Sequence, residues 1–147
     1  MNRKLLFYIT AILLCFGILS CNKKESIATC NYEVVPLPKS ITPAKEAPFI
    51  LSTSTHIGYP EGNQKLKQTA DFLSGYIREM TGIETKVTED RGSSNGIHLV
   101  LDRTAASSPE GYRLKVNKKN ITITGNSEAG IFYGIQTLRK SLPVTTQ

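Results

Sequence analysis

The sequence predicts an α+β domain of two layers, in which a mixed β-sheet with a β-hairpin in its C-terminal half is covered by two main helices. Three observations lead to this fold class. Residues 111–125 alternate between apolar and polar side chains on both sides of a short turn. Residues 64–81 and 130–142 each carry an apolar stripe at helical spacing. Residues 97–101 form a short apolar run, as in a buried strand.

The first part of the domain is predicted to be an extended arm, because four prolines between positions 36 and 48 remove backbone donors. A short strand is expected at Phe49–Ser52, and the turn residues of Gly58–Asn63 lead into a helix over residues 64–81. Asn63 is the expected N-cap, and Gly82 is the expected left-handed residue that ends the helix. The stripe that faces the core is formed by Leu66, Ala70, Leu73, Ile77 and Met80.

Strands are predicted to follow this helix. Ile83, Thr85 and Val87 alternate as one strand, and turn residues fill positions 88–96. Ile97–Leu101 suits a strand that is buried on both faces. The β-hairpin then spans Gly111–Gly125, with its turn at residues 118–120.

The last helix is expected to be capped by Asn126 or Ser127 and to be ended by Pro143. Gly130 and Gly134, four residues apart, expose backbone on one strip of this helix. A sheet or another domain could therefore approach that strip closely. The apolar stripe consists of Ile131, Ile135, Leu138 and Leu142.

The amino terminus is predicted to be a lipoprotein signal peptide over residues 1–20. Arg3 and Lys4 precede the uncharged apolar run 5–19, which is shorter than the roughly twenty residues of a membrane span. The run closes on Ser20-Cys21, which resembles the bacterial lipobox. Cys21 is therefore the expected lipidation site and first mature residue, with an uncleaved anchor as the alternative.

This signal implies a location and a domain organisation. We expect a lipid-anchored protein of the bacterial cell envelope, attached to membrane lipid through Cys21. The outer membrane is favoured, because Asn22 is not the aspartate associated with inner-membrane retention in some bacteria. Residues 21–30 would form the lipidated tether, residues 31–143 the folded domain and residues 144–147 a linker stub.

Composition restricts the function further. The length of 147 residues allows one globular domain, and the net charge of +6 is modest for a dedicated nucleic-acid binder. We therefore expect no nucleic-acid partner. With Cys15 removed and Cys21 alkylated, only Cys30 would keep a thiol, so no intramolecular disulfide is expected.

Residue patterns typical of catalysis or metal binding are missing from the sequence. The acidic neighbours Glu89 and Asp90 lie on a polar loop and are expected to point apart. His56 and His98 lack metal-ligand spacing, and His98 is expected to be a packed strand histidine. The loop 92–96 lacks the Gly-Lys-Ser/Thr of a phosphate-binding loop. We assign no catalytic residue, no cofactor and no metal site.

The C-terminal part of the sequence resembles a known family. The resemblance is carried by Glu110–Val116, Ile121–Thr124 and Gly130–Leu138, and by the Pro-x-Pro segment in residues 34–39. These segments are similar to the amino-terminal accessory domain of family 20 glycoside hydrolases, the β-N-acetylhexosaminidases, over about residues 31–143. The resemblance implies a zincin-like domain, followed in cis by a catalytic (β/α)₈ barrel. An Asp-Glu pair of that barrel removes terminal N-acetylhexosamine.

The same resemblance implies a role for this chain. No position matches the catalytic pair and the sequence stops at Gln147. We therefore expect the non-catalytic domain of a truncated or split membrane-anchored hexosaminidase, inactive alone. Because the last helix adjoins the barrel in that family, Phe132 is expected to be partly exposed. The alternative is a stand-alone surface lipoprotein module that binds glycans through exposed aromatic residues, Tyr59, Tyr76 and Tyr133.

Overall fold

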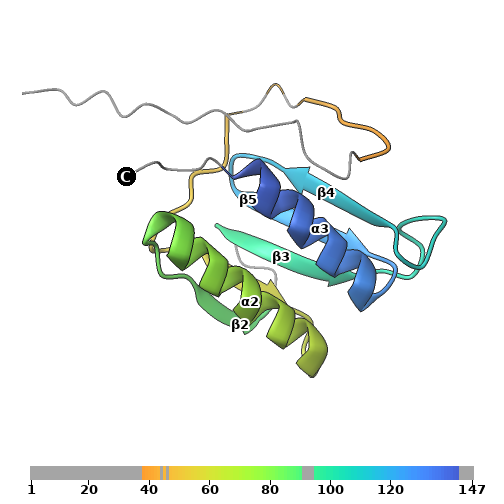
Figure 1. Ribbon diagram of the computed structural model, residues 1–147, viewed down its shortest axis with the longest axis horizontal. Helices are drawn as coiled ribbons and strands as arrows, with labels where there is room; N and C mark the ends of the chain where they lie inside the picture. Colours follow the sequence, from red (N-terminus) through yellow and green to blue (C-terminus); the bar gives the residue numbers. More distant parts are fainter. Residues whose placement is uncertain (1–37, 44, 46, 91–94, 143–147) are drawn as a thin grey trace, which may run out of the picture.

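The computed structural model describes residues 38–43, 45, 47–90 and 95–142. The described part begins with an arm that has no regular structure and continues as five strands and two helices (Figure 1). In chain order the elements are β1 (His56–Tyr59), α2 (Gln64–Thr81), β2 (Lys86–Glu89), β3 (Gly96–Leu101), β4 (Tyr112–Val116), β5 (Asn120–Gly125) and α3 (Glu128–Ser141).

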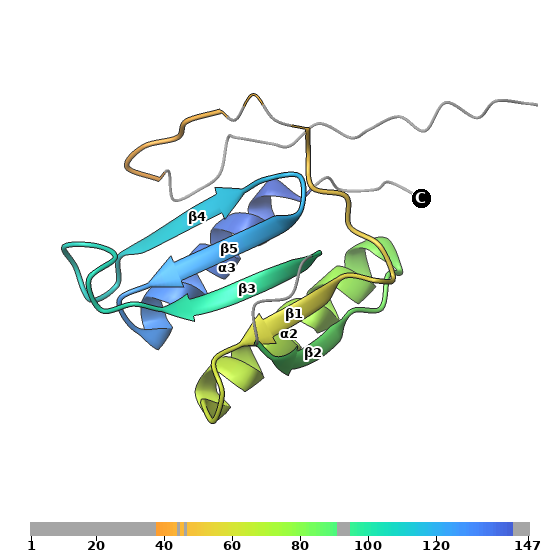
Figure 2. The ribbon, with the colours of Figure 1, turned by 180° about the vertical axis from the view of Figure 1, so that it is seen from behind.

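The five strands form one mixed sheet in the order β2-β1-β3-β5-β4. The pairs β1–β2, β1–β3 and β3–β5 are parallel, and β4 pairs antiparallel with β5. Both helices lie on the same face of the sheet (Figure 1), and among the described residues no helix lies on the opposite face, called the helix-free face below (Figure 2). The predicted two-layer α+β fold and the predicted hairpin are therefore confirmed.

Helix α2 begins and ends where the sequence predicts. The Asn63 side chain accepts a hydrogen bond from the Leu66 N–H at 3.0 Å, which satisfies one of the free donors of the first turn. Gly82 has φ 71°, the left-handed conformation that glycine adopts without strain. The amphipathic stripe of α2 is buried as predicted at Leu66, Ala70, Leu73 and Ile77, whereas Met80, its last predicted member, is half-buried.

Helix α3 packs closely against the hairpin because two of its positions lack a side chain. A Cβ atom at Gly130 would lie 2.5 Å from the Gly111 carbonyl oxygen. At Gly134 it would lie 2.4 Å from Ile123 Cγ2. Ser127 is the N-cap and accepts from the Gly130 N–H, whereas the Asn126 side chain holds the preceding loop through the Ala106 N–H at 2.7 Å. The predicted close approach is thus an approach of α3 to its own sheet.

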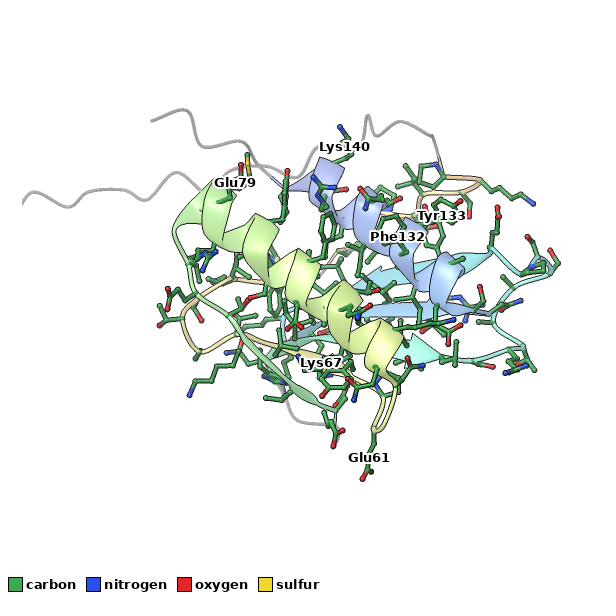
Figure 3. The ribbon with its side chains drawn as sticks, turned by 60° about the horizontal axis from the view of Figure 1, so that its bottom comes forward. Glu61, Lys67, Glu79, Phe132, Tyr133 and Lys140 are labelled. Atoms are coloured by element: carbon green, nitrogen blue, oxygen red, sulfur yellow. The ribbon has the colours of Figure 1, made fainter. Side chains whose placement is uncertain are left out.

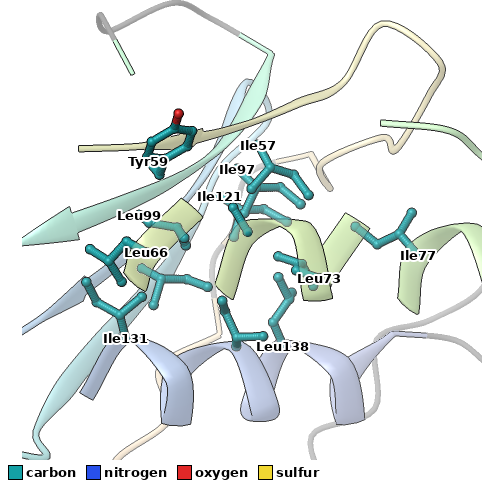
Figure 4. Packing of buried hydrophobic residues seen from close by; sticks show 13 residues of the cluster. Ile57, Tyr59, Leu66, Leu73, Ile77, Ile97, Leu99, Ile121, Ile131 and Leu138 are labelled. Carbon is teal, nitrogen blue, oxygen red and sulfur yellow. The ribbon is translucent and has the colours of Figure 1, made fainter. Parts of the chain in front are cut away.

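The core lies between the sheet and the two helices (Figure 4). Buried aliphatic side chains of β1, β3 and β5 meet the stripes of both helices there, and the partly buried Val87 of β2 and Leu114 of β4 pack against them. Tyr59 also belongs to the core, with 7% of its surface exposed. At about 25 cal/mol per Å² of apolar surface removed from water, this cluster is the main stabilising feature of the domain. Its fully buried members include Ile57, Leu66, Leu73, Ile77, Leu99, Ile123, Ile131 and Ile135.

Three sequence predictions about strands need correction. Phe49–Ser52 is not a strand, although Phe49 and Leu51 pack against the core. Gly58 and Tyr59 belong to strand β1, so the predicted turn begins only at Pro60. Strand β2 begins at Lys86, not at position 83. In each case pairing with neighbouring strands, which the local sequence does not reveal, decides where the strand lies.

The predicted signal peptide, Cys21, the tether, Cys30, Pro143 and the linker stub lie outside the described residues. Neither helix in the described part has the length and apolar character needed to cross a bilayer.

Candidate functional site

Exposed aromatic side chains gather on the outer side of the helix pair. Phe72 on α2 and Phe132 and Tyr133 on α3 are 43%, 40% and 43% exposed. Phe132 lies between the other two, with ring centroids 6.0 Å from Phe72 and 6.3 Å from Tyr133. Figure 3 shows Phe132 and Tyr133 on the side of α3 that faces away from the sheet. The partial exposure predicted for Phe132 is confirmed.

Arg139 on α3 extends this aromatic surface toward α2. Its guanidinium carbon lies 4.1 Å from the centroid of the Tyr76 ring and 4.9 Å from that of Phe72, so the cation stacks on both rings. Its Nη1 donates to Gln136 Oε1 at 2.6 Å, and the Tyr76 hydroxyl donates to the Arg139 carbonyl at 3.4 Å. Nε of Arg139 is buried without a hydrogen-bond partner. We call the surface of Phe72, Tyr76, Phe132, Tyr133 and Arg139 the aromatic face.

A groove of about 670 Å³ opens beside the aromatic face. It is lined by Phe72, Tyr76 and Arg139 together with Gly75, Arg78 and Glu79 of α2. A Cβ atom at Gly75 would have no neighbour within 4 Å, so the missing side chain leaves this part of the groove open. The combination of stacked rings and one cation is typical of the buried centre of protein–protein interfaces.

A second cluster lies on the helix-free face of the sheet. His98 Nδ1 and Asp90 Oδ2 are 2.5 Å apart, and the ring centroids of His56 and His98 are 5.5 Å apart. His98 is 6% exposed, which confirms the predicted packed strand histidine. Within residues 38–90 and 95–142, apart from positions 44 and 46, no three His, Cys, Asp or Glu side chains converge on a possible metal ion.

The structure separates the acidic neighbours Glu89 and Asp90. Glu89 Oε1 accepts from the Gly62 N–H at 3.3 Å, whereas Asp90 Oδ2 contacts His98. The two carboxylates therefore have different partners, as expected for neighbours that point apart, although Glu89 is the last residue of β2 and does not lie on the predicted loop.

The aromatic residues named for glycan binding do not form one set. Tyr59 is buried in the core, which contradicts its predicted exposure. Tyr76 and Tyr133 do lie on the aromatic face. Phe72 and Arg139 complete this face, although the sequence analysis does not identify them as site residues. Their positions off the apolar stripes were the available signal.

The family assignment comes from comparison with known proteins. The profile described as "Glycosyl hydrolase family 20, domain 2" matches residues 31–147. The chain belongs to the family 20 glycoside hydrolases. The matched part corresponds to the accessory segment of these proteins, as the sequence resemblance predicts.

Named relatives of this family 20 chain are much longer than the chain itself. It is 26% identical over 137 residues to the β-hexosaminidase of Porphyromonas gingivalis, covering 89% of this chain and 17% of that protein. A putative β-hexosaminidase of Pinctada maxima is 27% identical over 124 residues, covering 80% and 11%. The chain therefore spans less than a fifth of the length of these relatives.

Solved structures of the family share the fold. The Streptomyces coelicolor β-N-acetylhexosaminidase superimposes with a TM-score of 0.70 at 34% identity, covering 79% of this chain and 23% of that chain. The Streptomyces plicatus enzyme gives 0.64 at 36% identity, covering 75% and 21%.

Proposed function

We propose that this family 20 domain is the non-catalytic accessory domain of a membrane-anchored β-N-acetylhexosaminidase, and that its aromatic face packs against the catalytic (β/α)₈ barrel. The observation that supports this proposal is the exposure of Phe72, Phe132 and Tyr133 side by side on the helix pair. Burial of these rings by a partner would remove apolar surface from water at about 25 cal/mol per Å².

The chemistry of the aromatic face suits a protein partner. Aromatic residues and arginine are enriched in the buried centre of interfaces, where their large rigid side chains bury much surface at a small entropic cost. Arg139 is already held between Tyr76 and Phe72, so docking would immobilise few additional rotatable bonds. Charged residues lie at one end of the helix pair, where Glu79 and Lys140 occupy the C-terminal ends of α2 and α3 in Figure 3.

The proposed anchor keeps the domain at the cell envelope. Cys21 would carry the lipid, and residues 21–30 would act as the tether. Attachment through acyl chains gains roughly 0.8 kcal/mol for each buried methylene, so several chains hold a protein stably at a bilayer. We propose that the protein is located in the outer membrane. The reaction, removal of terminal N-acetylhexosamine, would be carried out by the barrel. The zincin-like character that the resemblance implies stays a prediction.

The first experiment tests the non-catalytic role. The purified chain is incubated with an aryl β-N-acetylglucosaminide, and no release of the aryl group is expected. Turnover that a single Asp or Glu substitution abolishes would contradict the accessory role.

The second experiment tests the docking surface with a chimera. Residues 31–142 are fused ahead of the catalytic domain of the Streptomyces coelicolor relative, in place of its matching segment. Phe132→Ser should lower the melting temperature of the chimera more than that of the free chain, because only the chimera would cover the ring. Ile50→Ser is the matched control, since Ile50 is 71% exposed and lies outside the helix pair. Equal effects of Phe132→Ser in both proteins would contradict docking at this face.

A glycan-binding module is the second candidate function. The observation in its favour is the groove beside Tyr76, because sugar sites combine an aromatic ring with a few polar groups. Saturable binding of chitin oligosaccharides to the free chain, lost in Tyr76→Ala and kept in Tyr59→Phe, would support it. Without such binding this candidate fails.

A further inference from the structure

The two histidines of the chain meet on the helix-free face of the sheet, although 42 positions separate them in the sequence. They lie on the adjacent parallel strands β1 and β3, where His56 pairs in register with Gly96 and His98 with Gly58. Because side chains alternate along a strand, both histidines point away from the core that Ile57 and Ile97 enter. Their rings are 5.5 Å apart and steeply inclined, at 76°.

Glycines opposite the histidines make room for this cluster. A Cβ atom at Gly96 would lie 2.5 Å from His56 Nε2, and one at Gly58 would lie 2.8 Å from the Asp90 carboxyl group. The His56 ring therefore covers Gly96, and the Asp90 carboxylate covers Gly58.

The two ring nitrogens of His98 differ in their contacts. Nδ1 contacts Asp90 Oδ2 at 2.5 Å, and the two side chains are only 8% and 15% exposed. Nε2 is buried and has no hydrogen-bond partner. A buried polar atom without a partner is uncommon in folded proteins and calls for a physical reason. Histidines that bind metal ions characteristically donate their other ring N–H to a carboxylate, as His98 can donate to Asp90.

The separation of the two rings matches a shared metal ion. A metal–nitrogen distance of about 2.1 Å at a tetrahedral angle puts the centroids of two imidazoles on one ion about 5 Å apart. The observed 5.5 Å is close to this value, so a small rotation of the side chains would suffice. Lys86 pairs in register with His56 and is exposed, and its charge would weaken the binding of a cation.

We propose that His98 Nε2 and a ring nitrogen of His56 bind one divalent transition-metal ion of the Zn²⁺ or Ni²⁺ type. Asp90 positions the His98 ring and is not a ligand. Water completes the coordination, so this is an open site with two protein ligands. A bound ion crosslinks β1 and β3 on the face that carries no helix. This site is independent of the aromatic face.

The test is a titration of the full chain with NiCl₂, followed by calorimetry and by the melting temperature. One saturable site is expected, with a melting temperature raised by about 6 °C at ten times the dissociation constant. His98→Gln and His56→Gln should each abolish the rise, and Asp90→Asn should weaken binding tenfold or more. Binding that survives in both histidine variants would assign the ion to other ligands and overturn the proposal.

Nuclear magnetic resonance of the wild-type chain tests the same site without any variant, so it does not depend on whether the variants fold. Since the chain has two histidines, its two imidazole Cε1–H signals are easily assigned. In the wild-type chain both signals should broaden together as Ni²⁺ is added. Broadening of neither signal, or of one alone, would overturn the two-histidine site.

Discussion

The substitution Gly134→Ala tests directly how tightly α3 packs against the sheet. Its new methyl group would lie 2.4 Å from Ile123 Cγ2 and 3.2 Å from the Tyr112 ring. Neither neighbour can withdraw easily. Ile123 is fully buried, and the Tyr112 hydroxyl is hydrogen-bonded to Thr137 Oγ1 at 2.6 Å. The same substitution at Gly75 of α2 meets nothing within 4 Å and is the matched control.

Two opposing effects decide whether each glycine-to-alanine substitution raises or lowers the free energy of unfolding. Replacing glycine by alanine inside a helix stabilises it by about 1 kcal/mol. Forcing an extra methyl group into a packed core costs about 1–3 kcal/mol. Gly75→Ala should therefore stabilise the domain by about 1 kcal/mol, whereas Gly134→Ala should destabilise it by roughly 1 kcal/mol. Gly130→Ala should cost more, because its methyl group would meet the backbone carbonyl of Gly111 at 2.5 Å.

The assay is thermal unfolding followed by circular dichroism, with urea unfolding as the second measurement. A difference of about 2 kcal/mol between the two alanine variants corresponds to about 8 °C in melting temperature for a domain of this size. If Gly134→Ala raised the melting temperature as much as Gly75→Ala, α3 would not be packed against Ile123 and Tyr112 as described, and the reasoning would be refuted.

Three further predictions concern surface and terminal residues. The free chain with Phe132→Ser should bind less of a hydrophobic dye and lose about 2 kcal/mol at most, because a fully buried Phe costs about 3–5 kcal/mol and this one is 40% exposed; a larger loss would place its ring in the core. Hydrogen bonds from its own backbone N–H and from Asn63 hold the pKa of Glu128 below its ordinary value. The stabilising contribution of the Glu128 carboxylate is therefore present above about pH 4.3 and disappears as the pH falls through the lowered pKa. Unfolding curves of wild type and Glu128→Gln should accordingly differ at pH 7 and converge at about pH 2–3. A difference in stability that stays constant with pH would contradict this linkage. Cys21→Ser should remove a metabolically incorporated fatty-acid label, and label that stays on the variant would show that Cys21 is not the anchor.

The sequence by itself determined the features that depend on near neighbours along the chain. The hairpin follows from alternation on both sides of a turn, in which the Asn117 side chain accepts from the N–H groups of Lys119 and Asn120 at 2.8 Å. The bounds of α2 follow from Asn63 and Gly82, whose capping roles act within one helical turn. The apolar stripes of both helices identified most of the helical contribution to the core.

Only the tertiary structure decided which distant residues meet. Strand β1 has four residues and contains Gly58, so its local pattern favours a turn; its extended conformation depends on pairing with β2 on one side and β3 on the other. The register of those pairs turns Tyr59 into the core and brings His56 beside His98. Likewise, the packing of α2 beside α3 brings Phe72 and Tyr76 to Arg139. The physical reason is that strand register and helix packing are set by burial summed over the whole sheet, which a local stretch of sequence does not specify.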